Sequence, residues 1–158
     1  MSQFSSRLEE TKPAVYTLIL DNRLDELTRL ADWINHLAGK FGLPAKVIFQ
    51  LDLIVAEAVT NVINYAFENE KTHQITVTLQ YQKHRVTVEI VDDGQPFDPL
   101  QHPPVVFPRK LEEASKGGLG IHLIRTYTDE CHYRREGDKN ILTLIMSDSI
   151  MKNSQDAF

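Results

Sequence analysis

Apolar and polar positions repeat with two different periods along this chain, and the two periods predict its strands and helices. A period of two, together with many Val, Ile and Thr residues, favours strands. The segments with this pattern are 14–20, 74–81, 85–91, 130–135 and 140–147. A period near 3.6 predicts helices at about 22–41, 44–67 and 120–127. The predicted order is one strand, two helices, two strands, one helix and two strands.

Turn and capping residues mark the ends of several of these elements. Asn22 is expected to cap the first helix, and Gly42 is expected to end it. Pro44 is expected to begin the second helix. Residues 83–84 and 137–138 are short links between alternating segments, so each predicts an antiparallel hairpin.

This order of elements predicts an α+β fold, a two-layer α/β sandwich. Hairpins and consecutive helices favour a mixed, mostly antiparallel sheet with the helices packed on one face. The chain does not alternate strand and helix, so its glycines are not those of a Rossmann domain. We expect a single domain at 13–148 between flexible tails at 1–12 and 149–158. The proline-rich segment 95–116 is interpreted as a lid over a site.

The second predicted helix is apolar around nearly its whole circumference, which predicts burial on most sides. Its polar exceptions fall on one narrow stripe and are Glu57, Thr60, Asn61 and Asn64. Glu57 and Asn61 are one turn apart, and their oxygens suit Mg²⁺ or its water ligands. Glu57 could also accept a proton from an attacking hydroxyl. The alternative is a solvated stripe, although a carboxylate on a largely buried helix needs a partner.

A second candidate segment follows the strand at 85–91. Asp92, Asp93 and Gly94 are residues that form turns whatever the function. A carboxylate fixed at Asp92 could nevertheless accept a hydrogen bond from the exocyclic amine of adenine. Gly94 would allow the base to approach the backbone closely. Phe97 is expected to pack this turn against the core.

A third candidate segment leads into the last helix. It consists of Gly117, Gly118, Leu119 and Gly120. Glycines at a helix N-terminus expose unpaired N–H groups that can bind phosphate, although a flexible hinge would use the same residues. Lys116, and with less weight Arg109 and Lys110, could add positive charge near a terminal phosphate.

Composition and charge narrow the classes of function. Among 158 residues, 42% are hydrophobic and 25% are charged, as in soluble globular proteins. The net charge of −5 and the dispersed basic residues argue against direct binding to nucleic acid. Neither a long apolar run nor a signal sequence is evident, so no membrane association is expected. The single cysteine, Cys131, suits a reducing compartment, and a cytoplasmic location is expected.

The three candidate segments together resemble the GHKL ATPase/kinase superfamily and, within it, the small anti-sigma-factor serine/threonine kinases of bacteria. The resemblance extends over residues 14–148. It is carried by AEAVTNVINYAF at 56–67, DDGQPFDP at 92–99 and GGLGIHLIR at 117–125. The short chain, without a phosphoacceptor-histidine domain, favours this branch over histidine kinases and gyrases.

The resemblance implies a Bergerat ATP-binding fold with ATP and Mg²⁺ as its cofactors. It implies that Glu57 is the general base and that Asn61 binds the metal. It further implies that Asp92, with Gly94 beside it, reads adenine. The phosphate-binding glycines of the family correspond to Gly118 and Gly120.

The resemblance also implies partners. Kinases of this branch phosphorylate a serine or threonine on a small anti-anti-sigma protein with a STAS domain. They also sequester a sigma factor, and many form homodimers. Two alternatives stay open from the sequence. One is a partner-switch module that binds ATP and sequesters a protein without phosphoryl transfer, and the other is a kinase whose target is not a sigma antagonist.

Overall fold

Five strands with alternating buried and exposed side chains form one sheet, which we describe from a computed structural model. The described residues are 12–101 and 118–148. The strands are β1 (Ala14–Asp21), β2 (Gln74–Gln82), β3 (Arg85–Asp92), β4 (Glu130–Glu136) and β5 (Lys139–Ser147). Their order is β1-β2-β3-β5-β4, and all four pairings are antiparallel. The predicted antiparallel character is thus confirmed, and no pairing between these described strands is parallel.

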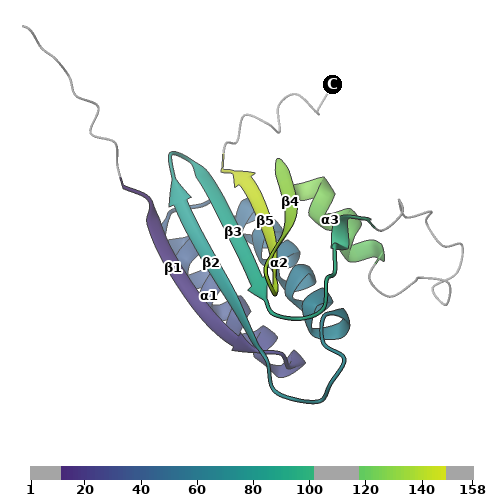
Figure 1. Ribbon diagram of the computed structural model, residues 1–158. Coiled ribbons are helices and arrows are strands. Elements are labelled where there is room, and N and C mark those ends of the chain that lie inside the picture. The colour runs from purple at the N-terminus through teal and green to yellow at the C-terminus, as the bar shows by residue number, and fades with distance from the viewer. Residues whose placement is uncertain (1–11, 102–117, 149–158) are drawn as a thin grey trace, which may run out of the picture.

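Helices cover one face of this sheet (Figure 1). They are α1 (Leu27–Lys40), α2 (Ala45–Tyr65) and α3 (Gly118–Tyr127). Two short 3₁₀ turns, η1 (Leu24–Glu26) and η2 (Pro99–Gln101), precede α1 and follow β3. The helix α2 lies between α1 and α3 and contacts both. The predicted two-layer α/β sandwich is therefore confirmed.

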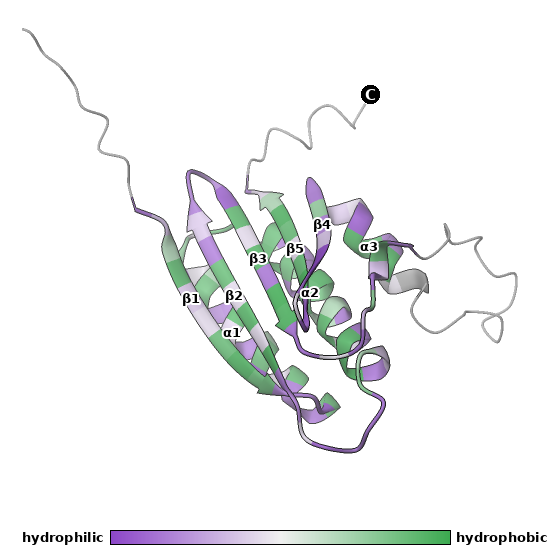
Figure 2. Cartoon of the chain, in the orientation of Figure 1, coloured by the Kyte–Doolittle hydropathy of each residue, from purple (hydrophilic) through white to green (hydrophobic). Residues whose placement is uncertain are grey.

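The core lies between the two layers, where strands and helices present their apolar positions (Figure 2). The buried apolar residues of α2 are Leu51, Ile54, Val55, Ala58, Val59 and Val62. By length and composition alone, this one helix of the described residues could cross a membrane, with 39% of its most apolar stretch buried. Its packing against α1, α3 and the sheet is that of the core helix predicted from its apolar circumference.

The predicted cap at Asn22 is wrong. The first helical segment begins as the 3₁₀ turn η1, and α1 itself begins only at Leu27. The side-chain oxygen of Asn22 instead accepts a hydrogen bond from the backbone N–H of His73 at 2.8 Å. The backbone N–H of Asn22 donates to the carbonyl of His73 at 3.0 Å. Asn22 is thus used to join the end of β1 to the start of β2.

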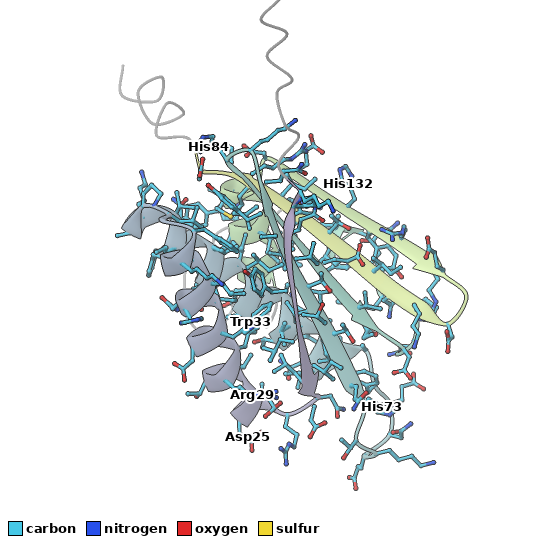
Figure 3. All side chains as sticks on the ribbon, turned by 90° about the vertical axis from the view of Figure 1, so that its left-hand side faces the viewer. Asp25, Arg29, Trp33, His73, His84 and His132 are labelled. Atoms are coloured by element: carbon cyan, nitrogen blue, oxygen red, sulfur yellow. The ribbon has the colours of Figure 1, made fainter. Side chains whose placement is uncertain are left out.

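The predicted hairpin at residues 83–84 is confirmed, and it also holds the end of β5. Lys83 and His84 have φ angles of 51° and 63°, which a tight turn of matching twist requires. The Tyr81 hydroxyl donates to Asp148 Oδ2 at 2.6 Å, and His84 Nδ1 lies 3.2 Å from the same oxygen. Figure 3 shows His84 at this end of the sheet and His73 at the opposite end.

The hydrogen bond between Tyr81 and Asp148 should make a pH-dependent contribution to the free energy of unfolding. The hydrogen bond to Asp148, followed by burial and the charge of Asp148, raises the pKa of Tyr81 to about 12. Because the folded-state pKa exceeds the ordinary value of 10.0, the contribution is complete below pH 10 and lost as pH rises through 12. The stability difference between wild type and Tyr81→Phe should therefore shrink over this interval. Urea unfolding from pH 8 upward measures it, and a constant difference would contradict the assignment.

Candidate functional site

Asp92 ends β3 with a buried carboxylate that is only 4% exposed. Its Oδ1 atom accepts hydrogen bonds from the Gly94 backbone N–H and from Asn140 Nδ2, each at 2.9 Å. Its Oδ2 atom accepts none from any residue that the structure describes. Burial raises the pKa of the Asp92 carboxyl, the nearby charge of Asp93 adds to this, and the two hydrogen bonds and Arg135 oppose it. The sequence-predicted base reader is therefore a fixed, desolvated acceptor.

Asp92 and Asn61 line the same pocket, although they are distant in the sequence. Most of the lining is apolar and comes from α2, β3 and β5, and its other polar side chains are Tyr133 and Asn140. Phe97 and Pro99, from the segment after β3, complete the lining. The pocket has room for about one water molecule, at about 10 Å³. Because a purine is larger, lining side chains must move to admit one.

Within the part of the chain that the structure describes, Asn61 has an unpaired side-chain donor in the core. It is 4% exposed, and its Nδ2 atom has no hydrogen-bond partner among the described residues. Leaving a buried donor unpaired costs about 1–3 kcal/mol, so such groups are rare unless a ligand satisfies them. A carboxamide presents a donor or, after a half-turn, an oxygen. Either end suits a phosphate with its hydrated metal ion.

The amide oxygen of Asn61 is a ligand type that suits Mg²⁺. The described residues offer too few ligands to hold a metal ion without a bound phosphate. Within residues 12–101 and 118–148, no group of three or more His, Cys, Asp or Glu side chains could hold a metal ion. Mg²⁺ typically keeps several waters and is shared between one or two protein oxygens and substrate phosphates. Asn61 with a bound triphosphate fits that pattern.

Glu57, one turn before Asn61 on α2, meets the first turn of α3. A Cβ atom at Gly120 would overlap Glu57 Oε2 and would lie 3.3 Å from Glu57 Cδ. Any larger residue at position 120 would require the Glu57 carboxylate to shift from this position. Two of the three sequence motifs, one from α2 and one from α3, are therefore in direct contact.

The glycine segment starts its helix slightly earlier than predicted. The third helix begins at Gly118, two residues before the predicted start at Gly120, so Gly118 and Gly120 both lie in its first turn. Glycine is a weak helix former, and packing against α2 outweighs that preference here. The N–H groups of a first helical turn have no partner within the helix and carry partial positive charge. These N–H groups could bind an anion, and phosphate binding at this turn stays a prediction.

Gly94 lies close to the end of α2. A Cβ atom there would lie 2.7 Å from Ala66 Cβ, and the next backbone N–H, of Gln95, donates to the Ala66 carbonyl at 2.8 Å. The expectation was that Gly94 would approach a base. The structure gives a different reason for a glycine at position 94. The turn after β3 contacts the end of α2 so closely that a side chain would not fit.

Phe97 is predicted to pack against the core, but it is not part of the main core cluster. It lines the pocket and stacks on Tyr65, with ring centroids 5.6 Å apart. After Phe97 the chain forms η2, where the Leu100 carbonyl accepts a hydrogen bond from Arg125 of α3. The beginning of the predicted lid is thereby tied to the helix that carries the glycines.

Several predicted residues cannot be placed. Lys116 and Gly117, together with Arg109, Lys110 and most of the predicted lid, lie outside the described residues. The backbone of Leu119 belongs to α3, and its side chain is outside the description. Their roles stay predictions.

Sequence reasoning missed Asn140, Tyr133 and Arg135. Asn140 is 4% exposed and contacts Asp92 directly. One signal was present in the sequence. Asn140 occupies an inward position of β5, in phase with the buried Leu142 and Leu144, where alternation predicts an apolar residue.

Comparisons with known proteins identify the family and the fold. Residues 20–146 match the family described as Histidine kinase-like ATPase domain. The chain is 33% identical over 114 residues to the serine/threonine-protein kinase BtrW of Bordetella bronchiseptica, covering 71% of this chain and 79% of that protein. It is 30% identical over 115 residues to the serine-protein kinase RsbW of Listeria innocua, covering 70% and 73%. The predicted resemblance is confirmed.

Two solved structures share the fold. The RsbU and RsbW domains of Rv1364c from Mycobacterium tuberculosis superpose with a TM-score of 0.63 and 12% identity, over 85% of this chain and 32% of that one. The histidine kinase domain of Erythrobacter litoralis EL346 gives a TM-score of 0.52 and 20% identity, over 82% and 63%. This chain therefore spans about a third of the first solved chain and under two thirds of the second.

The contact between Gly94 and Ala66 predicts a steric cost. Gly94→Ala should lower the free energy of unfolding by about 1–3 kcal/mol, because the new methyl group has no space. Gly39→Ala is the matched control, since Gly39 lies in α1 with nothing within 4 Å of its Cβ position. That control should gain about 0.5–1 kcal/mol from helix propensity. Urea unfolding compares the two, and an unaffected Gly94→Ala would refute the steric account.

Proposed function

This chain belongs to the histidine kinase-like ATPase domain family, and from that premise we propose that it binds Mg·ATP and phosphorylates a serine or threonine of a partner protein. The observation that carries the proposal is the meeting of the three sequence motifs. Asp92 and Asn61 share one pocket, and Glu57 contacts the glycine turn of α3. Kinship with proteins named serine-protein kinases supports the same activity.

In the proposed complex, Asp92 reads the base. Its Oδ1 atom is occupied by internal hydrogen bonds, which leaves Oδ2 as the acceptor for the exocyclic amine of adenine. Guanine presents a carbonyl oxygen at the corresponding position, which an ionised carboxylate repels. The apolar remainder of the pocket suits the faces of a flat ring.

The phosphates would extend from this pocket toward α3. Asn61 would hold the metal or a phosphate oxygen, and the backbone N–H groups at Gly118 and Gly120 would bind phosphate at the helix N-terminus. Mg²⁺, when bound, neutralises the charge that develops on the phosphates during transfer. These groups position and stabilise the reacting phosphate, which is the main requirement of phosphoryl transfer.

Glu57 would act as the general base. It orients the partner's hydroxyl and accepts its proton as the oxygen forms a bond to the γ-phosphorus. The bond from that phosphorus to the bridging oxygen breaks at the same time, and ADP leaves. The contact with Gly120 holds the carboxylate of Glu57 next to the turn where the phosphates would bind.

We further propose the partners that the family resemblance implies. The substrate would be a STAS-domain anti-anti-sigma protein, and the same chain would sequester a sigma factor. Neither nucleic acid nor a membrane would bind this chain directly. A cytoplasmic location and a homodimer complete this proposal. The support is the kinship with RsbW and BtrW and the similarity to a structure that joins RsbU and RsbW domains.

Labelled ATP tests the transfer and the role of Glu57 together. The wild-type chain should transfer label to the STAS-domain protein of its own organism. Glu57→Gln keeps the size of the side chain against Gly120 and should lower the rate by about 10²-fold or more, with ATP affinity unchanged. Full transfer by the variant would remove Glu57 from the mechanism. A stable complex of the wild type without label would favour the non-catalytic partner-switch module.

Asp92→Asn tests base reading. The variant keeps an oxygen for Gly94 and Asn140 but turns an N–H₂ group toward the amine of adenine, so ATP affinity should fall about tenfold or more. Calorimetric titration with ATP and GTP measures the loss of preference. Unchanged ATP affinity would exclude Asp92 as the base reader.

The raised pKa of Asp92 fixes the sign of two pH effects. Because burial raises this pKa, ATP affinity should fall on acidification at a higher pH than an exposed aspartate would give. The folded state holds the Asp92 proton more tightly than the unfolded state, so ionisation at neutral pH costs stability. Asp92→Asn should therefore be at least as stable as wild type at neutral pH, as thermal unfolding will measure.

A further inference from the structure

Asn140, at the start of β5, is the most highly connected polar side chain near the pocket. Its Nδ2 group donates to Asp92 Oδ1 at 2.9 Å and to the Gln95 carbonyl at 2.8 Å. Its Oδ1 atom accepts from the Tyr133 hydroxyl at 2.6 Å, Arg135 Nη1 at 3.0 Å and the Phe97 backbone N–H at 3.3 Å. Both ends of the amide are thus in use, so Asn140 has no spare N–H for a ligand.

These bonds span the turn that carries two pocket residues. Asp92 and Phe97 both line the pocket, and the same amide is bonded to each of them and to Gln95 between them. A second support comes from Arg135, which donates to the Gly94 carbonyl at 2.8 Å. One carboxamide therefore links the buried carboxylate of Asp92 to the backbone at Gln95 and Phe97.

We propose that Asn140 is a positioning residue that sets the nucleobase preference of this chain, a proposal that rests on the nucleotide binding proposed above. Asn140 does not touch the base. By donating to Oδ1, it fixes the rotation of the Asp92 carboxylate and leaves Oδ2 as an ionised acceptor toward the pocket. Tyr133 and Arg135 on β4 hold the amide in this orientation, because its Oδ1 end can accept their hydrogens and its Nδ2 end cannot.

Among the described residues, few charged and titratable groups surround this amide. Asp92 ends β3 and Asp93 follows it, and Tyr133 and Arg135 come from β4. From α2, the pocket receives the neutral Asn61, while Glu57 lies one turn away against Gly120. A carboxyl introduced in place of the amide would therefore couple to Asp92 and to Arg135, which both lie within hydrogen-bond distance of the amide.

Asn140→Asp is the sharpest test, because it keeps the shape and one accepting oxygen, replaces the N–H donor with a second acceptor and adds a negative charge. At pH 7 the two adjacent carboxylates should repel each other and turn the Asp92 carboxylate away from the orientation seen here. The ATP affinity should then fall about tenfold or more. On mild acidification the introduced carboxyl gains a proton, donates to Asp92 and restores part of the affinity. The wild-type affinity should instead fall on acidification. A variant with wild-type affinity, pH profile and ATP-over-GTP preference would overturn the proposal.

A milder pair of variants keeps the test valid if Asn140→Asp does not fold. Tyr133→Phe removes one hydrogen bond that orients the amide, and it should lower ATP affinity about two- to fivefold. Tyr81→Phe removes a tyrosine–aspartate hydrogen bond at the hairpin of residues 83–84 and should leave ATP affinity unchanged. Equal effects of the two variants would overturn the proposal, because a general loss of stability would then explain both.

A measurement without nucleotide separates this proposal from the proposed function. Carbon NMR of the aspartate carboxyls follows the Asp92 titration in the free protein. Asn140→Asp should raise the apparent pKa of Asp92 relative to wild type, since a donor is replaced by a second carboxyl. A shift in this titration with no ATP binding by wild type would support the positioning of the Asp92 carboxylate by Asn140, and it would reject the nucleotide function together with the base preference that rests on it. An unshifted titration would overturn the positioning role whether or not ATP binds.

Discussion

The pairing register of β3 and β5 is the constraint on which the site depends. In this register Asp92 lies opposite Asn140, and the amide can donate to the buried carboxylate. Burying a charged group without such partners is costly, and hydrogen bonds to Asp92 Oδ1 offset part of that cost. A slip of one residue would turn Asn140 to the open face of the sheet. The Asp92 carboxylate would then keep only the backbone N–H of Gly94 as a hydrogen-bond donor. The apolar residues that follow along β5 hold the register, because a slip would also move Leu142 and Leu144 out of the core.

The helix α2 sets the second constraint, because one rigid element carries both the amide and the carboxylate of the site. Its apolar residues are fixed between α1, α3 and the sheet, so the positions of Asn61 and Glu57 follow from core packing. Asn61 is then left with an unpaired buried donor, which reduces stability unless a ligand is bound. A core helix with an unsatisfied amide at a pocket is consistent with a binding site maintained at some expense of stability.

Local patterns predicted the parts of the fold and site that depend on neighbours in sequence. The polar stripe of α2 and the turn after β3 could be read this way, and so could the hairpin at residues 83–84. The failures involve distant partners or weak propensities. Asn22 looks like a helix cap, but its oxygen bonds to His73, 51 positions later. The role of Asn140 depends on Asp92, 48 positions earlier, and so on strand register. Glycine disfavours helices, yet α3 begins at Gly118, two residues before the predicted start, where it packs on α2.

The contact between Glu57 and Gly120 explains why a cation belongs to the proposed reaction. The first turn of α3 has unpaired N–H groups that attract anions, and the carboxylate of Glu57 already lies against it. A triphosphate bound at the same turn would place a second anion beside Glu57, and like charges at close range repel. A divalent cation would relieve that repulsion, and Asn61, one turn along α2 from Glu57, could hold it through an uncharged oxygen.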